Sequence, residues 1–163
     1  MLLGGARSGK SALAVELAGK RATYVATAVA SDDEMAARIE RHRAERPPAW
    51  TTVEEPVALG VALAAVEGDA VVDCLSLWVS NLMEAGWEDE AIEDEARAIA
   101  RAAAARPGMT VAVSNEVGSG VVPATPLGRR YRDVLGGVNR AWATEADRAL
   151  LVVAGRALEL ERI

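Results

Sequence analysis

The segment from Gly4 to Ser11 constrains the fold of this chain more than any other. It reads Gly-Gly-Ala-Arg-Ser-Gly-Lys-Ser and matches the complete pattern G-x-x-x-x-G-K-[ST], with a short apolar strand before it and an alanine-rich helix after it. In such a loop the glycines let consecutive backbone N–H groups turn inward around an oxyanion. The pattern therefore predicts that a nucleoside triphosphate binds to Gly4, Gly5, Ala6, Arg7, Ser8, Gly9, Lys10 and Ser11.

Two side chains of this loop and one distant carboxylate have predicted roles in catalysis. Lys10 would reach the β- and γ-phosphates, and Ser11 would offer its hydroxyl to Mg²⁺. The run from Ala70 to Asp73 is an apolar strand that ends in a carboxylate, the arrangement that holds Mg²⁺ opposite the loop in such folds. We expect Lys10 to be catalytic and Ser11 and Asp73 to bind the metal. The alternative is that Asp73 caps a helix beginning at Leu75.

Apolar runs of strand-like length recur along the chain, and segments long enough for helices separate them. This alternation predicts an α/β fold with a mostly parallel sheet and helices on both faces, in a single domain spanning residues 1–163. We expect strands at 23–26, 70–72, 110–113 and 150–154, and helices at 32–45, 56–66, 75–85, 88–105 and 127–146. A turn at Gly155 followed by the apolar segment 158–160 predicts an antiparallel edge strand.

Composition narrows the partners and the location that we expect. The 24 acidic and 18 basic residues give a net charge of −6, which disfavours binding to nucleic acid. The chain has no apolar run of about eighteen residues and no recognisable signal peptide, so we expect a cytoplasmic protein without a membrane span. The only cysteine, Cys74, lies in an apolar run and is expected to be a small buried side chain.

The only histidine, His42, has two interpretations on a helix. Arg38, His42 and Arg46 are spaced i, i+4 and i+8, and neighbouring cations favour a neutral imidazole that can attack a phosphorus atom. However, Met35, Ile39 and His42 are spaced i, i+4 and i+7, which places the histidine at the end of an apolar face. The pattern by itself leaves both interpretations open.

A phosphate loop does not name a reaction, because motors, switches and kinases all contain one. A guanine-specific switch would carry an Asn-Lys-x-Asp segment after a strand, whereas here the strand at 110–113 runs into Ser-Asn-Glu-Val-Gly. A switch GTPase is therefore disfavoured, while a simple small-molecule kinase and a nucleotide-dependent assembly module remain open. Glu54 could accept hydrogen bonds from guanine, and Glu116 could be a catalytic base or a second Mg²⁺ ligand. Either could equally be a solvated carboxylate.

Beyond the phosphate loop, characteristic segments are spread over nearly the whole chain. They are Tyr24-Val25-Ala26-Thr27-Ala28, Asp33-Glu34-Met35-x-x-Arg38-Ile39-x-x-His42, Arg46-Pro47-x-x-Trp50-x-Thr52-x-Glu54, and further segments at 73–82, 115–123 and 132–139. Together with the loop, they resemble the bifunctional adenosylcobinamide kinase/adenosylcobinamide-phosphate guanylyltransferases of cobalamin biosynthesis. One departure is Arg41, where some family members carry a second histidine. His42 is then the only candidate for the family's nucleophile.

The resemblance implies a P-loop NTPase with a RecA-like fold and a reaction in two steps. The hydroxyl of adenosylcobinamide would be phosphorylated with ATP or GTP, and GMP from GTP would then pass to adenosylcobinamide phosphate through a histidine-linked intermediate, giving adenosylcobinamide-GDP. His42 would be the guanylylated residue. The family also implies a homo-oligomer, specifically a trimer. Carried over by position, the further nucleotide contacts are Ala26, Thr27, Ala28, Arg43, Ala44, Glu45 and Arg46, with Glu54 and Asp73 completing the site.

Overall fold

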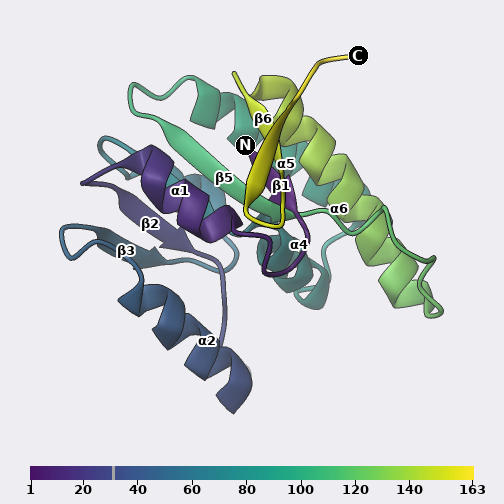
Figure 1. The fold of residues 1–163 in the computed structure, drawn as a ribbon. Helices are drawn as coiled ribbons and strands as arrows, with labels where there is room; N and C mark the ends of the chain where they lie inside the picture. The colour runs from purple at the N-terminus through teal and green to yellow at the C-terminus, as the bar shows by residue number, and fades with distance from the viewer. Residues whose placement is uncertain (31) are drawn as a thin grey trace.

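The computed structural model describes residues 1–30 and 32–163, and the side chain of Arg38 lies outside that description. The described strands form one seven-stranded sheet in the order β3-β2-β4-β5-β1-β6-β7 (Figure 1). All neighbouring strands are parallel except β6 and β7, which form the antiparallel pair expected from the turn at Gly155. The strands are β1 (Leu2–Gly4), β2 (Thr23–Ala26), β3 (Thr51–Glu54), β4 (Ala70–Asp73), β5 (Thr110–Asn115), β6 (Ala149–Val153) and β7 (Arg156–Leu160).

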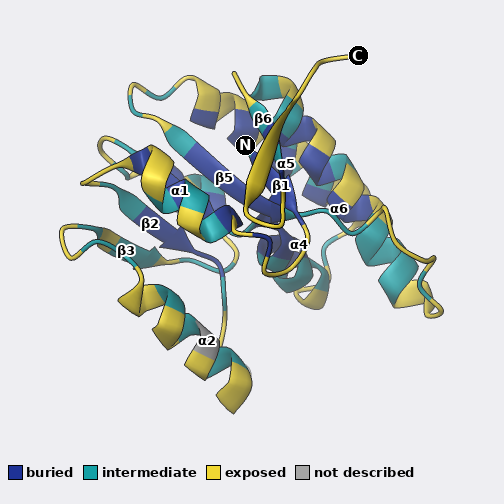
Figure 2. Ribbon diagram, viewed as in Figure 1, coloured by how far each residue is buried: buried dark blue, intermediate teal, exposed yellow. Residues whose placement is uncertain are grey.

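Helices cover both faces of the sheet, because successive strand residues point to opposite sides. On β4, Val71 packs in a cluster with Ala14 and Ala18 of α1, whereas Val72 packs in a second cluster with α3, α4, α5 and α6. The central strands are accordingly the most deeply buried part of the molecule (Figure 2). The predicted α/β architecture is confirmed. The helices are α1 (Lys10–Ala18), α2 (Asp33–Ala44), α3 (Leu59–Ala64), α4 (Leu75–Glu84), α5 (Asp89–Ala104) and α6 (Pro126–Glu145).

Two local features differ from the sequence prediction. The helix expected at 56–66 is shorter, because the Glu55 carboxylate accepts hydrogen bonds from the N–H groups of Val57 and Ala58 and holds them in a turn, so that α3 begins at Leu59. The edge strand β3 was not predicted. Its four residues are exposed or half-buried, so they give no apolar run, and pairing with β2 defines the strand.

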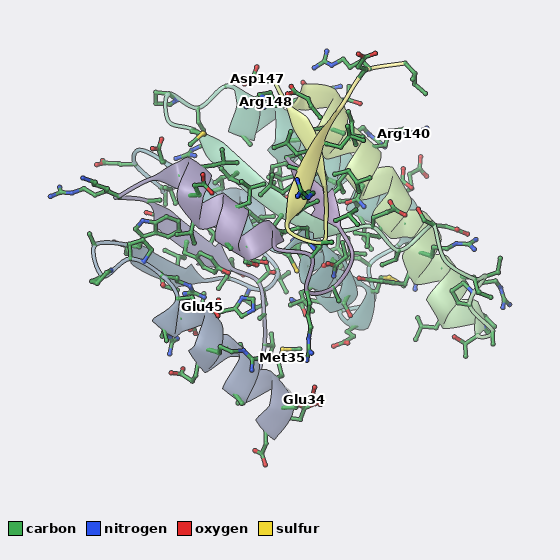
Figure 3. All side chains as sticks on the ribbon, in the orientation of Figure 1. Glu34, Met35, Glu45, Arg140, Asp147 and Arg148 are labelled. Atoms are coloured by element: carbon green, nitrogen blue, oxygen red, sulfur yellow. The ribbon has the colours of Figure 1, made fainter. Side chains whose placement is uncertain are left out.

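Helix α2 projects from the body of the molecule beside β2 and β3 (Figure 1). It begins where the Asp32 side chain accepts a hydrogen bond from the N–H of Met35, as expected for a capping aspartate. Figure 3 labels Glu34 and Met35 near its first turn and Glu45 at its other end. None of the described helices is long and apolar enough to cross a membrane.

The phosphate loop depends on a close approach between Gly4 and strand β6. Gly4 has a φ of +151°, and a Cβ atom there would lie 2.2 Å from the carbonyl oxygen of Val152. The loop is also tied to the turn between β6 and β7, because the N–H of Gly155 donates to the carbonyl of Ser8 at 2.9 Å. Only glycine fits at position 4 without displacing β6.

Gly4→Ala is therefore expected to destabilise the protein by at least about 2 kcal/mol, through strain at positive φ and a clash with β6. Gly5→Ala is the matched control, because a Cβ atom at Gly5 would meet nothing within 4 Å. Urea unfolding of both variants measures the difference. Equal stability of the two variants would show that β6 moves away at little cost.

Candidate nucleotide-binding site

The phosphate loop is folded around its own lysine. Lys10 is 7% exposed, and its ammonium group donates to the carbonyl oxygens of Gly4 and Gly5, both at 2.7 Å. Helix α1 begins at Lys10 and has no side-chain cap, because its N-cap residue is Gly9. No side chain therefore blocks the N–H groups of its first turn, the groups that bind phosphate oxygens in loops of this kind.

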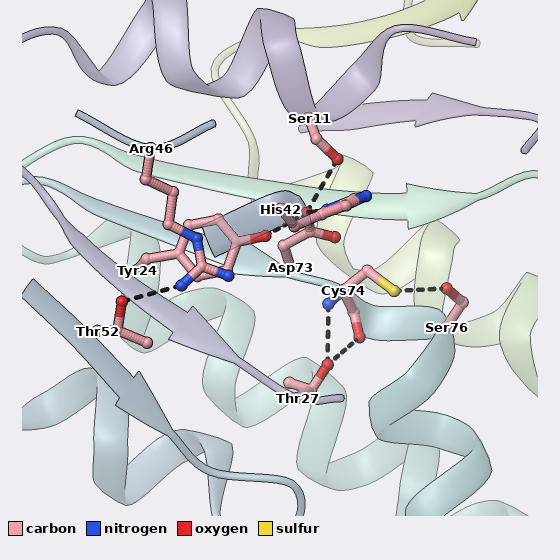
Figure 4. Close-up of polar contacts among 9 residues, drawn as sticks. All are labelled: Ser11, Tyr24, Thr27, His42, Arg46, Thr52, Asp73, Cys74 and Ser76. Atoms are coloured by element: carbon pink, nitrogen blue, oxygen red, sulfur yellow. Dashed lines mark hydrogen bonds and ion pairs between the residues drawn. The ribbon is translucent and has the colours of Figure 1, made fainter. Parts of the chain in front are cut away.

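A single carboxylate oxygen connects the loop to two other elements. Asp73 Oδ2, at the end of β4, accepts hydrogen bonds from the Ser11 hydroxyl at 2.9 Å and from the Tyr24 hydroxyl at 2.5 Å. The Nδ1 atom of His42 lies 3.9 Å from the same oxygen (Figure 4). The alternative role of Asp73 as a helix cap is wrong, because the N-cap of α4 is Cys74, whose side chain makes no capping hydrogen bond.

Tyr24 was given no role in the sequence analysis, yet it lies at the centre of this arrangement. It is 4% exposed, and the Arg46 guanidinium carbon lies 3.5 Å from the centre of its ring. Burial, followed by the charge of Asp73 and the hydrogen bond to it, raises the pKa of Tyr24 far above its ordinary value. The phenol therefore stays protonated and donates to the carboxylate. A sequence signal existed, since Tyr24 begins one of the segments that carry the family resemblance.

His42 lies in a small cavity between α2 and the carboxyl ends of β2 and β4. Its side chain is 28% exposed, and Met35 and Ile39 line the same cavity. The position agrees with the second interpretation of the helix pattern, because the ring ends an apolar face. The nearby Asp73 carboxylate was expected by neither interpretation. The cavity volume of about 50 Å³ is too small for a nucleoside. Its lining residues are Tyr24, Ala26, Ala28, Met35, Ile39, His42, Arg43, Arg46, Glu54, Asp73, Cys74 and Leu77.

Two arginines predicted to contact nucleotide lie at this cavity and already have protein partners. Arg43 forms ion pairs with Glu40 at 2.6 Å and with Glu54 at 2.5 Å. Arg46 donates to the Thr52 hydroxyl at 2.9 Å, while its buried Nε atom has no hydrogen-bond partner. The Arg38 side chain, the third member of the predicted stripe, lies outside the described residues.

Other predicted site residues lie apart from the cavity. Ala44 and Glu45 are exposed at the end of α2 and do not line it. Thr27 is fully buried, and its hydroxyl both accepts from the N–H of Cys74 and donates to the Cys74 carbonyl, each at 2.8 Å. Its side chain therefore joins the ends of β2 and β4. Glu116 accepts from two N–H groups of its own loop, those of Gly118 and Ser119.

Cys74 differs from its expected full burial. It is half-buried at the cavity, with its sulfur 2.9 Å from the Ser76 hydroxyl. The half-buried position follows from the end of β4, where the chain leaves the sheet at its carboxyl edge before α4 begins. Ligands of parallel α/β sheets bind outside this edge.

Comparison with known proteins gives one family over almost the whole chain. Residues 1–160 match the model of the family described as cobinamide kinase / cobinamide phosphate guanyltransferase. The bifunctional adenosylcobalamin biosynthesis protein CobP of Pseudomonas aeruginosa is 44% identical over 168 residues, which cover 99% of this chain and 96% of the relative. The CobU proteins of Salmonella typhimurium and Escherichia coli, which carry the same bifunctional description, are each 38% identical over 178 residues, covering 99% of this chain and 98% of each relative.

Lys10→Ala is expected to weaken GTP binding about a hundredfold, because it removes the buried cation at the loop. Lys20→Ala is a control of the same chemistry, since Lys20 is exposed beyond the end of α1. Calorimetric titration of both variants with GTP, with a thermal melt of each, measures the effect. Unchanged affinity in a folded Lys10→Ala protein would refute the predicted role of this lysine.

Proposed function

The chain belongs to the cobinamide kinase / cobinamide phosphate guanyltransferase family, and on this premise we propose that it phosphorylates adenosylcobinamide and then transfers GMP to the product. The phosphoryl donor is ATP or GTP, and the GMP comes from GTP through a covalent bond to His42. The observation that carries the proposal concerns one oxygen, Asp73 Oδ2. It accepts a hydrogen bond from Ser11 of the phosphate loop and lies 3.9 Å from Nδ1 of His42, the only histidine of the chain.

In the kinase step, the chain mainly binds and orients the nucleotide. When the nucleotide binds, Lys10 leaves the Gly4 and Gly5 carbonyls and contacts oxygens of the β- and γ-phosphates. The N–H groups at the start of α1 also donate to phosphate oxygens. The substrate hydroxyl then attacks the γ-phosphorus and loses its proton, the bond from this phosphorus to the oxygen shared with the β-phosphate breaks, and ADP or GDP leaves. Such transfers depend on positioning and charge stabilisation, and no protein nucleophile is required.

In the guanylyl step, the imidazole of His42 attacks the α-phosphorus of GTP. A nitrogen–phosphorus bond forms while the bond from the α-phosphorus to the oxygen shared with the β-phosphate breaks. Pyrophosphate leaves with the electron pair of that bond. The ring gains positive charge, which the nearby Asp73 carboxylate stabilises. A phosphate oxygen of adenosylcobinamide phosphate then attacks the same phosphorus, and the imidazole leaves as a neutral ring.

The residues at the loop also fit Mg²⁺. Ser11 Oγ and Asp73 Oδ2 lie 2.9 Å apart and are hard oxygen ligands. No cluster of three or more His, Cys, Asp or Glu side chains suited to a metal occurs within the described ranges. Mg²⁺ would take its remaining ligands from water and phosphate. Bound there, the ion would neutralise charge on the phosphate oxygens.

Two further parts of the proposal rest on the sequence analysis, and of these only the oligomeric state comes from the family resemblance. We propose that the protein is cytoplasmic and that it works as a homo-oligomer, specifically a trimer. Sedimentation equilibrium at micromolar concentration tests the oligomeric state, and a monomer would refute the trimer.

Incubation with α-labelled GTP and Mg²⁺ should place one GMP on each wild-type chain. The phosphoramidate bond should break in acid, because protonation turns imidazole into a good leaving group, and it should survive alkali. His42→Asn should lose the label and retain phosphorylation of adenosylcobinamide. Intact-mass analysis with peptide mapping measures the adduct. Label that maps to Lys10, or that persists on His42→Asn, would contradict the histidine mechanism, and a wild type that phosphorylates but never retains label would be a simple kinase.

Asp73→Asn should raise the Mg²⁺ concentration that gives half-maximal activity about tenfold and slow both reactions, because it removes the anionic ligand beside Ser11. The control is Asp133→Asn, an exposed carboxylate on α6 that pairs with Arg132. Magnesium titrations of both activities give the comparison. An unchanged magnesium requirement in Asp73→Asn would remove this residue from the metal site.

A further inference from the structure

The roles assigned so far leave Tyr24 unexplained. Its hydroxyl donates the shortest of the contacts to Asp73 Oδ2, at 2.5 Å, compared with 2.9 Å for Ser11 and 3.9 Å for His42. The last distance is too long for a hydrogen bond, so the present contact with His42 is electrostatic. The orientation of the carboxylate toward His42 must therefore be held by other groups.

Tyr24 is suited to hold it, because its ring cannot easily move. It lies on β2, which pairs with β4 in a register that places Ala26 beside Asp73. The ring is almost fully buried, with the Arg46 guanidinium over one face and the Trp50 ring centre 6.4 Å away. Its hydroxyl position is thus fixed by the sheet. Ser11, in contrast, lies in the first turn of α1 and is a proposed ligand of Mg²⁺.

We propose that Tyr24 is a positioning residue for guanylyl transfer, whose hydroxyl holds the Asp73 carboxylate toward Nδ1 of His42 and thereby makes Nε2 the attacking nitrogen. A carboxylate beside one ring nitrogen keeps the proton on that nitrogen and leaves the lone pair on the other. The proton stays on Nδ1 while the bond from Nε2 to phosphorus forms and pyrophosphate leaves. This inference rests on the proposed function, because it assigns a task within the guanylyl step.

The proposal predicts an unequal effect on the two reactions. Phosphoryl transfer to the substrate hydroxyl does not use the imidazole. Tyr24→Phe also keeps the charge of Asp73 and its contact with Ser11 for Mg²⁺, so the loss of the Tyr24 hydroxyl should slow phosphorylation little. Guanylylation requires the imidazole in the correct tautomer, so the same loss should slow it strongly. Tyr24→Phe keeps the ring, its burial and the stacked Arg46, and removes one oxygen.

The chain supplies a matched control, since its only other tyrosine is Tyr131. Tyr131 is half-buried on α6, and its hydroxyl donates to the carbonyl of Ser76 at 3.0 Å and not to Asp73. Tyr24→Phe should slow formation of the GMP adduct about tenfold in single-turnover assays. The KM for GTP should change less than about twofold, and the rate of adenosylcobinamide phosphorylation less than about threefold. Tyr131→Phe should leave all three values near those of the wild type.

A spectroscopic measurement tests the same point without turnover. Because His42 is the only histidine, the imidazole ¹⁵N spectrum of the full chain reports one ring, with His42→Asn as the blank. At a pH chosen so that a free imidazole is neutral, the wild type should carry the ring proton on Nδ1, and Tyr24→Phe should shift the population toward the other tautomer. Tyr131→Phe should not.

Two results would overturn the proposal. One is an unchanged tautomer together with an unchanged rate of adduct formation in Tyr24→Phe. The other is an equal loss of both activities with a lowered Tm, which would make Tyr24 a packing residue. A wild type that forms no GMP adduct would refute the proposed function instead, and the tautomer measurement would still decide whether Tyr24 positions the ring through Asp73.

Discussion

The arrangement of the site depends on the carboxylate of Asp73 and on the strand order that positions it. Strand β4 pairs with β2 on one side and with β5 on the other, and β5 in turn pairs with β1, which leads into the phosphate loop. Because all these strands are parallel, their carboxyl ends meet at one edge of the sheet. Ser11, Tyr24 and His42 come from three separate elements and face one oxygen there.

A buried polar network holds this edge in place. Thr27 bonds both backbone groups of Cys74, and Asn81 on α4 donates to the carbonyls of Thr27 and Pro56. Each such bond contributes about 1 kcal/mol, and leaving a buried partner unsatisfied would cost more. The network links the ends of β2 and β4 to the segment before α3. It therefore fixes the position of the Asp73 carboxylate, and the sheet sets the shape of the cavity beside α2.

The electrostatic surroundings of His42 differ from those that helix periodicity suggested. The i+4 spacing predicted that Arg46 would lie beside the imidazole, but its guanidinium lies over the Tyr24 ring and donates to Thr52. The Asp73 carboxylate lies 3.9 Å from His42. A carboxylate there stabilises the positive charge that develops during attack on phosphorus, whereas neighbouring cations would oppose it. The contact with Asp73 therefore supports the proposed guanylyl transfer.

The sequence by itself determined the phosphate loop, the alternation of strands and helices, and the family, because each is written in local patterns such as Gly4 to Ser11 and the apolar run before Asp73. It also identified His42 as a candidate nucleophile, a role that stays a proposal. Only the tertiary structure decided that Asp73 contacts the loop and does not cap α4, that β3 pairs with β2, and that Tyr24 bonds the same oxygen as Ser11. These contacts join residues 49 and 62 positions apart in the chain. They arise from strand register and side-chain packing, which a one-dimensional pattern does not contain.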